Sequence, residues 1–197
     1  MAPRMKTMMA ATSVAAALLL TTGCTANMGP SATLSQQETA IDQGVETTLS
    51  TLYTSVPGSR ELARKATGIL VFPKVYAAGL VVGGEHGRGA LVVGGRTLGY
   101  YQTTGVSLGL QAGAESRGLV FMFMTQDALD RFRAGNGWTA GVDASVAVLR
   151  AGANGALDAG DGAAAVNVFA LTNAGLMAAA NVEGTKVSRL DLPLPLQ

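Results

Sequence analysis

The spacing of Gly105, Ser107 and Gly109 matches the G-x-S-x-G pattern that presents a nucleophilic serine in many hydrolases. That pattern works where a sharp turn from a strand into a helix exposes the hydroxyl beside a histidine and an oxyanion hole. Here residues 110–113 continue a strand-like pattern, and the one histidine, His86, precedes the serine, whereas that fold places it afterwards. We therefore expect Ser107 to be a glycine-flanked serine on a bent strand.

A second motif, Gly135 to Ala140, matches the G-x-G-x-x-A spacing of a dinucleotide-binding loop. Such a loop must follow a strand and open a helix, because the helix amides then meet the pyrophosphate. This stretch instead follows a predicted helix and opens a predicted strand. The order of the elements argues against a dinucleotide site.

The sequence offers few candidate residues for a metal site or for acid–base catalysis. One cysteine and one histidine exclude an internal disulfide and an ordinary Cys/His zinc site. Glu85 and His86 are neighbours that could form an acid–base pair, but no nearby residue type would orient them. We expect no enzymatic activity, no cofactor and no metal.

The lone cysteine, Cys24, follows an uncharged run, Met8–Leu20, which is preceded by two basic residues. A run of this length is typical of a signal-peptide core and is too short to span a bilayer. Small residues before the cysteine resemble the lipobox of bacterial lipoproteins, although Leu20 lies one place earlier than usual and Thr21 takes its position. The alternative is a secretory peptide cut elsewhere, which would leave Cys24 as a free thiol.

A lipobox implies that Cys24 becomes the acylated first residue. Two or more acyl chains anchor a protein stably, whereas one is marginal. Thr25 follows, where an Asp would retain a lipoprotein in the inner membrane of enteric bacteria, so we expect a periplasm-facing anchor in the outer membrane of a Gram-negative bacterium. The expected segments are a signal peptide (1–23), an acylated cysteine with a flexible tether (24–34), a lipid-binding domain (35–191) and a Pro-rich tail (192–197).

The composition fits one folded domain. The 197 residues are 48% apolar and 14% charged, which is too apolar for a disordered chain. The formal charge of +1 does not suggest a nucleic-acid partner. The 26 glycines show no collagen repeat.

Helical signals begin at Ser35, which with Glu38 fits a capping box. Apolar residues then recur at helical spacing through Ile41, Val45, Leu49, Leu52 and Val56. A short helix capped by Ser59 and another capped by Thr125 are also predicted.

Strand signals begin after Gly68. Ile69–Phe72 is predicted to end at Pro73, and the repeat of Leu80–Gly84 in Leu91–Gly95 predicts a hairpin whose loop is 85–89. Further strands are predicted at 98–104, 106–113, 119–124, 142–149, 163–171, 176–182 and 185–190. The stretch 119–124 is apolar at every position, so we expect it to be covered on both faces. With so many small residues the sheet should curl. The predicted fold class is α+β, with a curled, barrel-like antiparallel sheet and two or three flanking helices.

Charge is unevenly distributed, since residues 60–96 carry six basic and two acidic residues, a net +4. Either these charges are ordinary solvated surface, or they form a face for anionic head groups, to which each contributes about 1 kcal/mol near a membrane. On the second hypothesis Arg64, Lys65, Lys74 and Arg88 share one face, with aromatic residues beside them, although large aromatics are more often core. The predicted lipid-binding residues are Arg64, Lys65, Lys74, Arg88, Arg96, Phe72, Tyr76 and Trp138.

Three motifs in order resemble the SYLF domain family: ATGILVFPKV at 66–75, a glycine-rich stretch at 78–89, and TGVSLGLQAG at 104–113. The resemblance extends over about residues 35–191. It implies a lipid-binding module, since eukaryotic members bind phosphoinositides and some bind actin through extra segments. Bacterial members commonly follow a lipobox.

The predicted function is a membrane-anchored, non-catalytic lipoprotein that binds anionic head groups or fatty acyl chains. Its predicted partners are membrane lipids, held through acylated Cys24 and the basic segment. The alternative is a structural or envelope-stress lipoprotein that acts through a protein or peptidoglycan partner.

Overall fold

A computed structural model describes residues 30–79, 82–108, 113–135, 137–151, 157–158, 164–172, 175–176, 182 and 184–190. The predicted signal peptide, Cys24 and the tail at 192–197 lie outside these residues. The helices are α1 (Pro30–Ser55), α2 (Ser59–Lys65) and α3 (Gln126–Ala134). The strands are β1 (Gly68–Gly79), β2 (Val82–Val93), β3 (Arg96–Leu108), β4 (Gly113–Phe123), β5 (Trp138–Thr139), β6 (Val146–Val148), β7 (Arg150–Ala151), β8 (Leu157–Asp158), β9 (Val166–Thr172), β10 (Gly175–Leu176) and β11 (Lys186–Arg189).

The main sheet has nine strands in the order β10-β9-β4-β1-β2-β3-β11-β5, with β6 paired to β9. Its neighbours are antiparallel except for the parallel pair β6–β9. The sheet is strongly curled. Strands β4 and β5 are five places apart in the strand order, yet the ring of Trp138 on β5 lies 5.9 Å from that of Phe121 on β4. The predicted α+β class with a curled, barrel-like sheet is confirmed.

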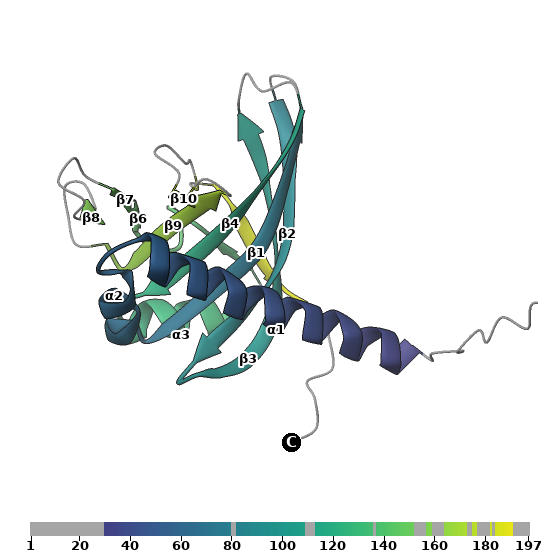
Figure 1. The fold of residues 1–197 in the computed structure, drawn as a ribbon, viewed down its shortest axis with the longest axis horizontal. Helices are drawn as coiled ribbons and strands as arrows, with labels where there is room; N and C mark the ends of the chain where they lie inside the picture. Colours follow the sequence, from purple (N-terminus) through teal and green to yellow (C-terminus); the bar gives the residue numbers. More distant parts are fainter. Residues whose placement is uncertain are drawn as a thin grey trace, which may run out of the picture.

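The curl creates two cores, one inside it and one between the sheet and α1, which lies across the outer face (Figure 1). Leu119, Val120, Phe121, Met122 and Phe123 of β4 are all fully buried, because alternate side chains enter the two cores. This confirms the prediction that this strand is covered on both faces.

Helix α1 begins at Pro30, five residues before the predicted cap at Ser35, so the end of the expected tether is helical. Proline suits the first turn of a helix, because its φ is preset and its missing N–H would have no helical partner there. The predicted apolar stripe is confirmed, since Ile41, Val45 and Val56 are buried. Leu49 packs partly buried against the same core.

The two short helices differ in their caps. In α3 the Thr125 side chain accepts from the amide of Ala128, as predicted. In α2 the cap position is Gly58, and Ser59 is the first helical residue. The Ser59 hydroxyl lies 2.6 Å from the carbonyl oxygen of Val56 and 3.1 Å from that of Leu52, which holds α2 against the end of α1.

Two predictions about the long strands are wrong. Strand β1 does not end at Pro73. Its register shifts at this residue against both neighbouring strands, β2 and β4, which places the proline in a bulge. In a bulge the residue need not donate an amide hydrogen bond to the next strand, so proline is accommodated. Residues 85–89 are not a loop but the middle of β2. The chain turns instead at Gly94 and Gly95, whose φ values of 58° and 80° suit a tight hairpin turn.

The predicted strand at 142–149 is shorter than expected. Only Val146–Val148 forms β6, and Val142 lies in the preceding turn with 78% of its surface exposed. The Asp143 carboxylate accepts from the amide of Thr139 and fixes this turn.

Candidate lipid-binding groove

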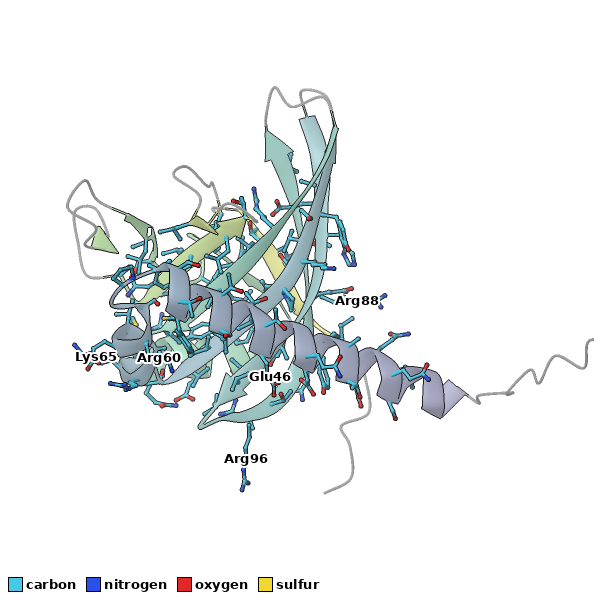
Figure 2. The ribbon with its side chains drawn as sticks, viewed as in Figure 1. Glu46, Arg60, Lys65, Arg88 and Arg96 are labelled. Carbon is cyan, nitrogen blue, oxygen red and sulfur yellow. The ribbon has the colours of Figure 1, made fainter. Side chains whose placement is uncertain are left out.

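The predicted basic residues do not form one face. Arg64 and Lys65 lie on α2, and Arg96 lies at the turn between β2 and β3 (Figure 2). Arg88 lies in the middle of β2, where its guanidinium donates to Gln37 near the other end of α1. Since α2 packs against Leu52, fifteen residues further along α1, about 22 Å of helix separates the two groups.

The structure does bring Lys74 and Arg88 together. They are register partners across β1 and β2, and Tyr76 and His86 are the next partners on the same face. Side chains two residues apart on a strand point to the same side of a sheet, so all four project toward α1. This grouping depends on the bulge at Pro73, because the register on either side of it differs.

These four side chains line a groove of about 770 Å³ beneath α1. The helix faces the bulge closely, since a Cβ on Gly44 would lie 2.8 Å from the Pro73 ring. The lining residues are Ala40, Ile41, Gln43, Gly44, Thr47 and Thr48 from α1, Pro73, Lys74 and Tyr76 from β1, and His86, Gly87 and Arg88 from β2.

The groove combines an apolar floor with a cationic edge. Ala40, Ile41 and Pro73 supply apolar surface, and Tyr76 is 57% exposed beside them. Lys74 and Arg88 are both exposed. Such a site can hold an acyl chain or glycerol backbone on the floor while the two cations bind a phosphate or carboxylate.

The acidic residues of α1 do not line the groove. Glu38 is buried, and the Asp42 carboxylate accepts from the hydroxyls of Thr97 and Tyr100 at 3.1 and 3.0 Å. Figure 2 shows Glu46 below α1 in this view and Arg88 above it. The negative charge of α1 therefore does not lie on the face that lines the groove.

Two of the three predicted aromatic contacts are core residues. Phe72 is fully buried and Trp138 is 2% exposed, and both pack in the cluster inside the curled sheet. Neither can form the floor of an exposed site, so the core interpretation of these two residues is the correct one. Of the three, Tyr76 lines the groove.

The sequence predicts neither His86 nor the α1 threonines as site residues. It places His86 in a loop, and the threonines carry no motif. Alternation along β2 places His86 and Arg88 on the same face of the sheet. This placement can be predicted only if residues 85–89 are known to form a strand.

The opposite face of the sheet carries a buried ion pair that joins β2 to β4. The Glu85 carboxylate lies 2.6 Å from the Arg117 guanidinium, and their side chains are 2% and 13% exposed. Gly105 makes room for this pair, because a Cβ there would lie 2.8 Å from Glu85 Oε1. Ser107 lies near the end of β3, in register with Gly83, which agrees with the strand position predicted for it.

Within the described residues, no three His, Cys, Asp or Glu side chains gather as a metal-binding group. No helix in this part of the chain is both long and apolar enough to cross a bilayer.

Residues 104–191 match the family model described as "Ysc84: Las17-binding protein actin regulator". The match confirms the resemblance to the SYLF domain family. It begins within β3 and covers the later strands and α3, so the groove residues, 40–88, precede it. No curated protein matches the chain.

Proposed function

We propose that this chain, which carries the SYLF pattern over residues 104–191, is a non-catalytic lipoprotein that binds anionic phospholipid or fatty acid in the groove beneath α1. The observation that carries the proposal is the pairing of Lys74 with Arg88 beside an apolar floor. An amphiphile with a negative head group is the ligand class that uses both features at once.

The cations supply much of the expected affinity. A hydrogen bond to a charged group contributes about 1.5–3 kcal/mol, and 1.4 kcal/mol corresponds to a tenfold change in affinity. Removing both cations should therefore weaken binding by about tenfold or more. The apolar floor should add about 25 cal/mol for each Å² of acyl surface removed from water.

The proposed anchor is acylated Cys24, in the outer membrane and facing the periplasm. Five residues lie between it and Pro30, and the six Cα-to-Cα steps reach at most about 22 Å when extended. The groove would thus lie close to the bilayer that holds the anchor and could exchange lipid with it. A non-catalytic role agrees with the strand position of Ser107.

The proposal is tested by lipid binding to the full chain in mild detergent, measured by native mass spectrometry with added phosphatidylserine and phosphatidylcholine. We expect phosphatidylserine to bind in preference, and Lys74→Glu with Arg88→Glu to reduce its occupancy about tenfold. The matched control is Lys65→Glu with Arg96→Glu, because these exposed cations lie outside the groove and the net charge change is the same.

An equal loss in the control pair would mean that net charge alone drives binding, and the groove assignment would fail. Absence of any anionic preference in the unaltered chain would reject the binding of anionic head groups at Lys74 and Arg88. It would favour the alternative of a structural or stress lipoprotein with a protein or peptidoglycan partner.

A further inference from the structure

A second, smaller cavity lies beneath α1 on the other side of β1. It measures about 140 Å³ and faces β4 and β9, whereas the groove faces β2. The two spaces share Thr47, Thr48, Pro73 and Lys74, so Lys74 stands where they meet. A ligand whose charged group binds Lys74 can extend into both.

Five of the ten residues that line the smaller cavity carry a hydroxyl group. Thr47, Thr48 and Thr51 come from α1, Ser116 from β4 and Thr172 from β9. This differs from the groove, whose floor is largely apolar. The larger space therefore suits acyl chains, and the smaller one suits a polar head group.

Thr48 turns its methyl group toward Gly118 at the cavity, and the hydroxyls of the three α1 threonines are all bonded within the helix. Each donates its proton to the carbonyl four residues earlier: Thr47 to Gln43 at 2.8 Å, Thr48 to Gly44 at 2.8 Å and Thr51 to Thr47 at 2.9 Å. A hydroxyl has one proton to donate and two lone pairs, so these oxygens can only accept from a ligand. The head group must supply the hydrogen-bond donors.

Charge decides which donors fit. An ammonium head group would be repelled by Lys74, whereas neutral hydroxyls would not be affected. The volume equals roughly four to five water molecules at about 30 Å³ each, which is enough for a three-carbon diol. A head group that donates hydrogen bonds, carries no positive charge and has this size is a glycerol attached to a phosphate.

We propose that this cavity is a head-group subsite that selects phosphatidylglycerol, with its phosphate at Lys74 and its glycerol hydroxyls on Thr47 and Thr51. The inference rests on the proposed lipid-binding function and deepens it, because it names the head group. The acyl chains would occupy the larger groove.

The test is competition between phosphatidylglycerol, phosphatidylserine and phosphatidylcholine with identical acyl chains, added in equal amounts to the full chain in mild detergent. Occupancy is read by native mass spectrometry. Phosphatidylglycerol and phosphatidylserine carry the same net charge, so charge alone cannot separate them. We expect phosphatidylglycerol occupancy to exceed that of phosphatidylserine by about two- to tenfold, the effect of one or two hydrogen bonds.

The variant Thr47→Val with Thr51→Val removes two acceptor oxygens at nearly constant shape. It should lower phosphatidylglycerol occupancy to the level of phosphatidylserine and leave phosphatidylserine unchanged. The control is Thr39→Val with Thr54→Val, since these threonines make the same bonds to Ser35 and Ser50 but line neither cavity. Circular dichroism verifies that both variants keep the fold.

Equal occupancy of the two anionic lipids, both above phosphatidylcholine, would overturn the head-group inference and leave lipid binding intact. Equal occupancy of all three would overturn both that inference and the binding of anionic head groups at Lys74 and Arg88. A glycerol preference that survives Thr47→Val with Thr51→Val, or that is lost equally in the control, would overturn the assignment to this cavity.

Discussion

The Tyr100 hydroxyl and the Asp42 carboxylate join the sheet to α1 through one short contact. The hydroxyl donates at 3.0 Å, and Thr97 donates to the other carboxylate oxygen at 3.1 Å. Because Tyr100 is 2% exposed, water cannot easily replace this bond. The contact fixes α1 on the side away from the groove, so it helps to set the width of the groove.

This contact predicts how stability depends on pH. Burial, followed by the hydrogen bond to Asp42 and the charges of Asp42 and Glu38, raises the pKa of Tyr100 well above its ordinary 10. The contribution of the neutral phenol is therefore fully present below about pH 10 and is lost as the pH rises above it. We expect the free energy of unfolding to decline above pH 10, and less steeply in Tyr100→Phe.

Urea unfolding between pH 7 and 11.5 measures both curves. At pH 7 the variant should be less stable by about 1–2 kcal/mol, because one hydrogen bond to a carboxylate is lost. Equal alkaline slopes would show that other groups, such as the partly buried Tyr53 and the buried Tyr101, account for the decline.

At the scale of elements, the glycines of β2 explain why its middle was mistaken for a loop. A Cβ on Gly87 would lie 2.8 Å from the carbonyl oxygen of Lys74, and one on Gly89 would lie 1.9 Å from that of Val71. These glycines permit close approach of the bulged β1 and do not mark a turn. Sequence alone cannot distinguish the two uses, because both require a residue without a side chain.

The bulge therefore predicts opposite outcomes for two glycines of one strand. Gly89→Ala should lower the free energy of unfolding by about 1–3 kcal/mol or more, because backbone must move to admit the methyl group. Gly84→Ala should change it by no more than about 0.5 kcal/mol, since nothing lies within 4 Å of its Cβ position. Urea unfolding at pH 7 compares them, and similar losses in both would contradict the role assigned to the bulge.

Across the whole molecule, the sequence predicted those features that depend on local periodicity. The apolar stripe of α1, the Thr125 cap and the doubly buried end of β4 needed no knowledge of strand pairing. Predicting the site does require knowledge of strand pairing, because Lys74 and Arg88 are fourteen residues apart and meet only through the register of β1 and β2. The separation of Arg64 and Lys65 from that pair likewise follows from the length of α1, which sequence analysis did not relate to the sheet.

The last prediction concerns how the whole molecule is held at the membrane. If Cys24 is the acylated residue, Cys24→Ala should abolish incorporation of labelled palmitate, because the thiol is the site of acylation. Thr25→Ala is the matched control and should keep the label. In detergent solution Cys24→Ala should still bind phosphatidylglycerol, since every groove residue comes from α1, β1 or β2. Persistent labelling would reject the anchor, whereas loss of binding together with the label would mean that lipid was held by the acylated end and not by the groove.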